Sequence, residues 1–287
     1  MNTQTKHPSP SRLALALLTA AAFFAAPAAF AQAQSSGGSD RVPVTLTDPS
    51  RPATLRVSLL NGGITVKGAD VKDVVVEARA RHDDDSDRKS RGGMRRLNVI
   101  SSGLTVEEEN NTVRVNADSN NKAVDLTITV PRQTSMRLRA TNDGDITVSG
   151  VEGELDVNNL NGEVTLSNVS GNVVAHALNG KILVTMSRVN GKPMAFSSLN
   201  GDIDVTFPAD LKANVVLKSD NGDVYSDFDV ALQTSAPQQT IEDGRSKGGK
   251  YRVKIEKAFR GTINGGGPEI QFTNFNGEIY IRKAGAK

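Results

Sequence analysis

The chain has 287 residues, no cysteine or tryptophan, and a formal net charge of +2 from 34 basic and 32 acidic side chains. The absence of cysteine excludes disulfides, thiolate metal ligands and lipid anchoring through a cysteine. A nearly neutral chain also lacks the basic footprint of a nucleic-acid-binding protein, so nucleic acid is not an expected partner.

The N-terminal segment has the three parts of a signal peptide. Lys6 and Arg12 precede an apolar run over residues 13–24, and small residues then lead to cleavage expected after Ala31 or Ala33. We therefore expect export to the periplasm, the cell surface or the exterior. No later segment approaches 18 consecutive apolar residues, so no integral membrane span is predicted.

The rest of the chain is expected to form one domain. Alternating apolar residues predict several strands between residues 59 and 140, and the polar segment 81–96 is expected to leave the body as a loop. The "HDDDSD" stretch in that loop lacks the spacing of a calcium-binding loop, and a solvated, self-neutralised loop is favoured. The predicted organisation is a signal peptide (1–31), a flexible leader (32–41) and a single domain (42–287).

A short repeat begins at Gly144: glycine, any residue, apolar, any residue, apolar, and a third apolar residue before the next turn. Apolar residues two apart, such as Val164 and Leu166, mark one face of a β-strand. The third apolar position is expected to face inward at a corner. It is occupied by Val151, Leu160, Val169, Leu178 and Leu199.

Alternate turns share an asparagine or, at Asp143, an aspartate before glycine. Two strand-turn units, about 18–21 residues, therefore form one coil of an all-β, single-stranded parallel β-helix, or β-solenoid, with irregular capping strands. Asparagines on successive coils are expected to form an amide ladder. An antiparallel meander is the alternative, because Asn-Gly also favours hairpins. The predicted turn residues of the regular coils (141–230) are Asn161, Gly162, Asn179, Gly180, Asn200, Gly201, Asn221 and Gly222.

The C-terminal part is expected to contain a polar loop over residues 232–250 and coils over 251–287 that finish the stack. The loop sequence "GRSKGGKY" resembles a phosphate-binding loop, but Tyr251 replaces the Ser or Thr that would contact magnesium. The following residues alternate like a strand and offer no helix N-terminus. A basic loop is therefore favoured over nucleotide binding, and no cofactor is predicted.

Outward carboxylates are the main candidates for chemistry or binding. Asp145 with Glu163, and Asp202 with Asp223, are expected to stack one coil apart, and stacked acids can share a proton or a cation. Solubilising roles are favoured, since Lys181 holds the same position on the coil between them. No catalytic, cofactor-binding or metal residue is predicted. The predicted binding face consists of Asp145, Asp156, Glu163 and Asp204.

The repeat resembles the bacterial β-strand-repeat family of putative adhesins, formerly a domain of unknown function. The resemblance extends from about residue 42 to 283 and includes the closing stretch "GTINGGGPEIQFTNFNGEIYIRK". It implies an exported or surface-associated β-solenoid and supplies no catalytic residues. The residues that carry it are the Asn-Gly units beginning at Asn61, Asn161, Asn179, Asn200, Asn221 and Asn276.

Two functions remain open from the sequence. The favoured one is a noncatalytic, adhesin-like scaffold that presents a repetitive face to an envelope polymer or a protein. The alternative is a β-helix enzyme, a lyase or hydrolase, acting on polysaccharide, with acids on one face. The absence of tryptophan and the presence of only three tyrosines weaken both enzyme and lectin interpretations. Self-association through open sheet edges is a further expectation.

Overall fold

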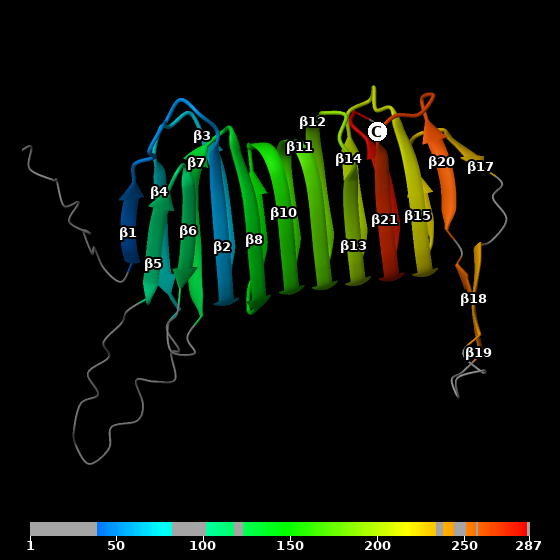
Figure 1. Cartoon of the computed structure of the whole chain (residues 1–287), viewed down its shortest axis with the longest axis horizontal. Coiled ribbons are helices and arrows are strands. Elements are labelled where there is room, and N and C mark those ends of the chain that lie inside the picture. The colour runs from blue at the N-terminus through cyan, green and yellow to red at the C-terminus, as the bar shows by residue number, and fades with distance from the viewer. Residues whose placement is uncertain are drawn as a thin grey trace, which may run out of the picture. The chain divides into compact units, whose positions relative to one another are not determined.

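The computed structural model describes residues 39–81, 102–117, 123–233, 238–243, 251–256 and 258–285. Every regular element in these ranges is a β-strand, and 20 of the strands belong to one continuous sheet (Figure 1). The described ranges contain no helix that is long and apolar enough to cross a membrane. The predicted all-β fold class is confirmed.

The sheet winds into coils with two faces, each built from parallel strands. Face I contains, in spatial order, β6 (Thr112–Ala117), β2 (Ala53–Asn61), β8 (Thr134–Asn142), β10 (Glu152–Asn161), the second half of β11 (Val164–Asn179), β13 (Met194–Asn200), β21 (Glu269–Asn276) and β15 (Ala213–Asn221). Face II contains β7 (Val124–Pro131), β3 (Ile64–Ala69), β9 (Ile146–Ser149), the first half of β11, β12 (Ile182–Val189), β14 (Ile203–Phe207), β22 (Ile279–Lys283) and β16 (Val224–Ser226). Because neighbouring strands run parallel, the β-solenoid is confirmed and the antiparallel meander is wrong for these coils.

The spatial order of the coils differs from their order in the chain. The last coil, β21–β22, lies between β13–β14 and β15–β16, so this coil does not finish the stack as expected. Near the other end, β2–β3 lies between β6–β7 and β8–β9. Most coils carry the same Asn-Gly and alternating pattern, so the pattern defines a coil without defining its neighbours.

Antiparallel strands close both ends of the stack, as the prediction of irregular capping strands requires. At one end β1 (Ser39–Val44) pairs with β4 (Val74–Ala80), β4 with β7, and β5 (Leu104–Glu109) with β6. At the other end β20 (Phe259–Ile263) pairs with β15, and β17 (Val230–Gln233) pairs with β20. These strands cover edges that would otherwise be open to pairing with another chain.

Three expected irregular segments have different outcomes. β1 begins at Ser39, inside the range 32–41 expected as a leader. Within the expected loop 232–250, β18 (Gln238–Asp243) pairs with β19 (Tyr251–Glu256) as a separate two-stranded sheet. The expected loop 81–96 lies outside the described residues, apart from Arg81.

Along the strands of the two faces, the apolar residues two apart fill the space between the faces, and almost all of them are buried. Near the inserted coil the core is aromatic: the rings of Phe196 and Phe272 stack 5.3 Å apart, and Phe207 contacts both rings edge-on at 6.4 Å. Such ring pairs add to the free energy gained by burying apolar area. The hydrophobic effect therefore couples β21 to the flanking coil β13–β14, which carries Phe196 and Phe207.

The third apolar position of the repeat divides into two kinds. Val151 and Val169 are buried, as predicted for an inward corner. The prediction is wrong for Leu160, Leu178 and Leu199, which are 37–40% exposed. These leucines directly follow inward residues in strands that continue straight to the turn, so alternation directs their side chains outward.

Beside these leucines runs a ladder of asparagine side chains. Five consecutive Nδ2–Oδ1 hydrogen bonds, each 2.8–3.0 Å long, connect Asn142, Asn161, Asn179, Asn200, Asn276 and Asn221 in spatial order. Asn142, rather than Asp143, occupies its rung of the ladder, because Asp143 is an extra turn residue with a φ of 60°. The ladder aligns the turns at this edge of face I.

Candidate binding groove

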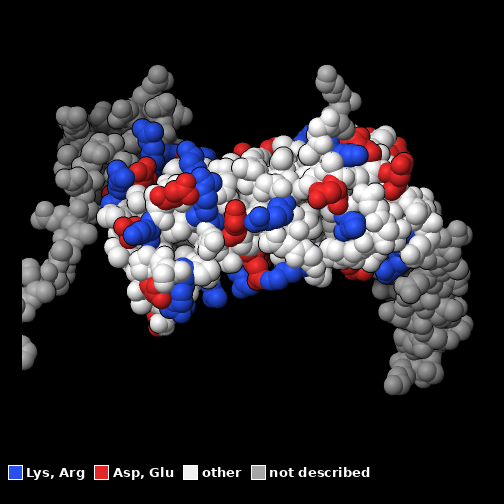
Figure 2. Space-filling view, turned by 90° about the horizontal axis from the view of Figure 1, so that it is seen from above, with Lys and Arg blue, Asp and Glu red and all other residues white. Residues whose placement is uncertain are grey.

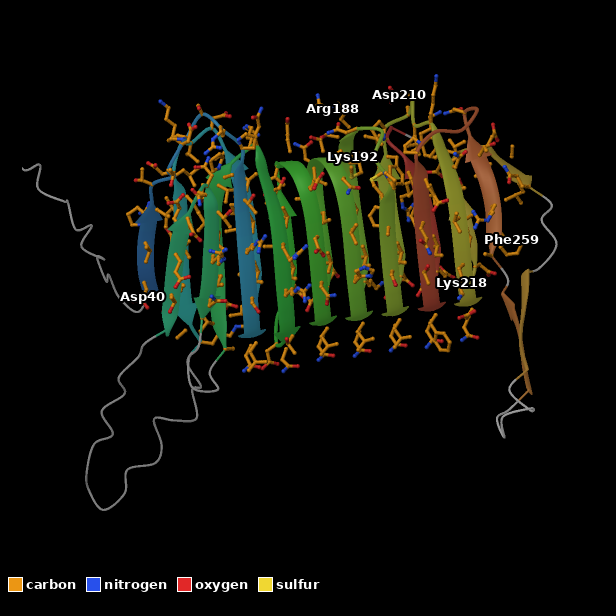
Figure 3. All side chains as sticks on the ribbon, viewed as in Figure 1. Asp40, Arg188, Lys192, Asp210, Lys218 and Phe259 are labelled. Carbon is orange, nitrogen blue, oxygen red and sulfur yellow. The ribbon has the colours of Figure 1, made fainter. Side chains whose placement is uncertain are left out.

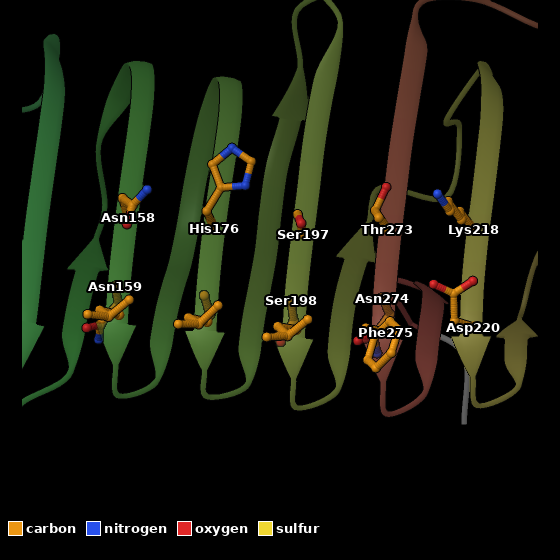
Figure 4. A pocket seen from close by; sticks show the side chains of 14 residues that line it. Asn158, Asn159, His176, Ser197, Ser198, Lys218, Asp220, Thr273, Asn274 and Phe275 are labelled. Atoms are coloured by element: carbon orange, nitrogen blue, oxygen red, sulfur yellow. The ribbon is translucent and has the colours of Figure 1, made fainter. Parts of the chain in front are cut away.

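A shallow groove of about 640 Å³ crosses the rungs of face I next to the asparagine ladder (Figure 4). One wall is a row that we call the apolar ridge, formed by Leu160, Leu178, Leu199 and Phe275. The ridge residues directly precede ladder asparagines on β10, β11, β13 and β21, which are four consecutive rungs. Their exposed fractions are 37%, 38%, 40% and 45%. Isolated exposed apolar residues are ordinary, but a continuous exposed row indicates a binding surface.

The opposite wall is a polar row in strict register. His176 on β11 lies between Asn158 on β10 and Ser197 on β13, and the row continues to Thr273 and Lys218. Figure 4 shows these side chains projecting from the same side of face I. The groove therefore offers an apolar contact and a hydrogen-bonding group on each of the four rungs from β10 to β21.

Small or amide side chains form the floor and are anchored to the turns. Asn159 Nδ2 donates to the carbonyl oxygens of Gly144 and Glu163 at 3.1 and 3.2 Å, and Ser198 Oγ donates to Gly180 O at 3.1 Å. Asn274 makes the equivalent bond to Gly201 O at 3.1 Å. Since these groups are buried and bonded, the floor is rigid and the two walls keep a fixed separation.

The four residues of the predicted binding face do not line this groove. Asp156 lies on face I, where its Oδ2 accepts from Arg137 Nε at 2.8 Å. Asp204 lies on face II and accepts from Arg282 Nε at 2.8 Å. Asp145 and Glu163 are neighbours in the turns before β9 and β11, and Asp145 Oδ1 accepts from Glu163 N at 2.7 Å. The structure brings only the last two together.

The expected stacking of Asp202 on Asp223 is wrong, because Glu278 of the inserted coil lies between them. Asp202 Oδ1 accepts from Glu278 N at 3.1 Å, and Asp202 Oδ2 pairs with Lys181 Nζ at 3.0 Å. The Lys181 hydrogen bond, followed by that from Glu278 N, lowers the pKa of Asp202. Asp145 and Asp202 thus each accept a hydrogen bond from a backbone N–H group in the turn of the neighbouring coil. Within the described ranges, no three His, Asp or Glu side chains are arranged to hold a metal ion.

A pair of stacked tyrosines on face II also depends on the inserted coil. The rings of Tyr225 and Tyr280 lie 5.2 Å apart and nearly parallel, with the Arg282 guanidinium 4.9 Å from the Tyr280 centroid. The Tyr280 hydroxyl donates to Glu278, and this hydrogen bond raises the pKa of Tyr280 to about 12. The hydroxyl is therefore protonated at neutral pH. The repeat does not predict this pair, because 55 residues of chain separate the two rings.

A second cavity of about 760 Å³ lies at the opposite ends of the strands, where Figure 3 labels Arg188, Lys192 and Asp210. Arg188 lines it and pairs with Glu152 at 3.4 Å, while nearby Lys192 pairs with Glu154 at 2.5 Å. The hydrogen bond and charge of Lys192 lower the pKa of Glu154. These charges neutralise one another within the chain, and the cavity lacks a row of exposed apolar side chains, so the groove is the stronger candidate.

Comparison with known families agrees with the repeat. The model of the family described as Toastrack DUF4097 matches residues 19–264, which is most of the chain. The chain belongs to this family. No curated protein matches.

Two solved structures resemble this chain. One is described as a putative cell adhesion protein from Clostridium sporogenes ATCC 15579, with 11% identity over 85% of this chain and 99% of that chain and a TM-score of 0.38. The other is described as a putative adhesin from Bacteroides fragilis NCTC 9343, with 13% identity over 86% of this chain and 98% of that chain and a TM-score of 0.32.

Proposed function

We propose that the protein is a noncatalytic, exported, adhesin-like scaffold that binds an extended polysaccharide of the cell envelope or exterior along the groove. The observation that carries the proposal is the apolar ridge, four exposed apolar side chains on consecutive rungs. A folded protein gains nothing from leaving such a row in water, whereas a ligand that covers it gains the hydrophobic free energy of each contact.

The geometry favours a polysaccharide over an extended peptide. Rungs recur about every 4.8 Å, whereas side chains on one face of an extended peptide recur about every 6.6 Å, so a peptide loses register within a few rungs. A sugar ring is close to one rung in length and combines an apolar ring face with hydroxyl groups. It can therefore contact Leu178 on one wall and His176 on the other within a single rung.

The composition of the groove argues against the enzyme alternative. Glycoside hydrolysis by the usual mechanism needs two carboxyl groups on either side of the scissile bond. Asp220 is the only carboxylate among the lining residues in the described part of the chain. A rigid floor and an open, repetitive surface fit binding through many similar contacts.

The groove proposal predicts a loss of binding without a loss of stability. Replacing Leu178 and Leu199 together by serine removes two adjacent ridge contacts, and we expect about tenfold weaker binding of an envelope polysaccharide fraction. Both side chains are already partly exposed, so the thermal midpoint is expected to stay within a few degrees. Titration calorimetry and circular dichroism measure the two effects.

Leu232→Ser is the matched control, because Leu232 is 62% exposed on β17 and does not line the groove. It is expected to bind like the unaltered chain. If the Leu178→Ser, Leu199→Ser double variant kept its affinity for the polysaccharide, the groove would not be the binding site.

Export is the second part of the proposal and rests on the N-terminal pattern. We expect the mature chain to begin after Ala31 or Ala33 and to appear in the periplasmic or surface fraction. Mass spectrometry of the intact chain from each cell fraction measures both its N-terminus and its location. A full-length chain found only in the cytoplasmic fraction would contradict export.

A further inference from the structure

Arginine side chains form a column on face I, on coils near the β1–β5 end of the stack. Arg56 on β2 lies between Arg114 on β6 and Arg137 on β8, each directly opposite in the strand register. Arg139, two residues after Arg137, projects from the same face. We call these four residues the basic patch. Seen from above, Figure 2 shows Lys and Arg side chains at the corresponding end of the stack, with Asp and Glu side chains among them.

This arrangement costs stability. Identical charges stacked on adjacent strands, about 4.8 Å apart, repel one another. Arg114 is partly compensated by Glu109 at 3.4 Å, and Arg137 by Asp156 at 2.8 Å. Arg56 and Arg139 are exposed and pair with no carboxylate in the described part of the chain. Two arginines without a counter-charge beside two further arginines form a surface suited to an anion from outside the chain.

The basic patch continues directly into the groove. Arg139 faces Asn158 across the β8–β10 pair, and Asn158 begins the polar wall of the groove. A linear ligand lying along the polar row would therefore pass from Asn158 to Arg139 in one rung. Arg56 and Arg137 then lie beside the same path.

We propose that the basic patch binds carboxylate groups of an acidic polysaccharide, a polymer of uronic acid units, whose chain continues into the groove; this inference rests on the proposed function. The planar guanidinium of arginine matches a carboxylate with two parallel hydrogen bonds, and it keeps its charge at all physiological pH values. The apolar ridge requires ring faces on the same polymer, which uronic acid units have and inorganic polyphosphate lacks.

The test uses the full mature chain and two polymers with the same backbone, polygalacturonate and its fully methyl-esterified form. The unaltered chain is expected to bind the acid form more tightly than the ester. The double substitution Arg56→Gln and Arg139→Gln is expected to weaken binding of the acid form about 5- to 30-fold and to leave binding of the ester unchanged. Lys67→Gln, which removes a cation from face II, is the matched control and is expected to change neither.

Stability provides a second readout that a structural role would not reproduce. Because the double substitution relieves repulsion, its thermal midpoint is expected to equal or exceed that of the unaltered chain. A fall of several degrees would mean that these arginines hold the fold together, and would overturn the inference.

The outcomes separate the two proposals. Equal affinity for the acid and ester forms, or no binding of polygalacturonate, overturns the acidic ligand and leaves the groove to a neutral polysaccharide. If inorganic polyphosphate bound as tightly as polygalacturonate, the basic patch would be a nonspecific anion surface. That result would also overturn the acidic polysaccharide as the ligand. The groove itself fails only if the Leu178→Ser, Leu199→Ser variant keeps its affinity for the envelope fraction.

Discussion

Gly180→Ala is expected to reduce the free energy of unfolding by about 3–5 kcal/mol, near the upper limit for a single substitution. A Cβ at this position would lie 2.0 Å from the carbonyl oxygen of Gly162 on the next coil. The contact is with backbone, so no side-chain rotation relieves it. The two coils would have to separate where Gly162 N donates to Asn179 O at 3.1 Å and Val164 N donates to Lys181 O at 2.9 Å. Urea unfolding of the purified mature chain measures the loss.

Gly191→Ala is the control for backbone conformation alone. Gly191 has a φ of +72°, and no atom lies within 4 Å of the position that a Cβ would take. Its substitution should cost only the strain of a left-handed residue, about 1–2 kcal/mol. If both variants lost the same stability, close approach between coils would not be the reason for glycine at position 180.

Local sequence patterns predicted the features that depend on one coil. Alternation placed residues such as Val164 and Leu166 inside, and the Asn-Gly turns predicted the ladder through Asn161, Asn179 and Asn200. The buried positions follow from a period of two residues, and the ladder follows from a period of one coil. Both periods can be read directly from the sequence.

The same patterns could have predicted the apolar ridge. Leu178 is apolar and precedes a turn, which favoured an inward corner. Counting by two from Val173 and Ala175 instead places Ala177 inside and Leu178 outside. Strand parity was the better guide here, because the strand continues straight to Asn179.

Features that depend on coil order were not predictable from the repeat. Phe275 joins the ridge, Glu278 separates Asp202 from Asp223, and Arg56 meets Arg137 only because two coils insert out of sequence. Interchangeable coils carry similar turns and similar alternation, so the pattern alone gives no energetic preference among neighbours. The order of the coils must therefore depend on the particular side chains that pack between them. The aromatic core beside the inserted coil is the clearest example.

Phe272→Ala is expected to lower the free energy of unfolding by about 3–5 kcal/mol, the usual range for a large buried aromatic residue. Phe272 is fully buried on β21, stacks on Phe196 and meets Phe207 edge-on. The cavity would open in the inserted coil, which pairs with β13 on one side and β15 on the other. We therefore expect hydrogen exchange to accelerate in β15 as well as in β21, measured residue by residue on the intact chain.

Phe275→Ala provides the matched comparison, because it removes the same side chain three residues later on the same strand. Phe275 is 45% exposed on the apolar ridge, so its loss should change the free energy of unfolding by less than about 1 kcal/mol. It should instead weaken polysaccharide binding, since the ridge loses its aromatic contact. If Phe272→Ala accelerated hydrogen exchange in β21 alone, β15 would not depend on the packing of the inserted coil. That result would contradict the predicted coupling between β21 and β15.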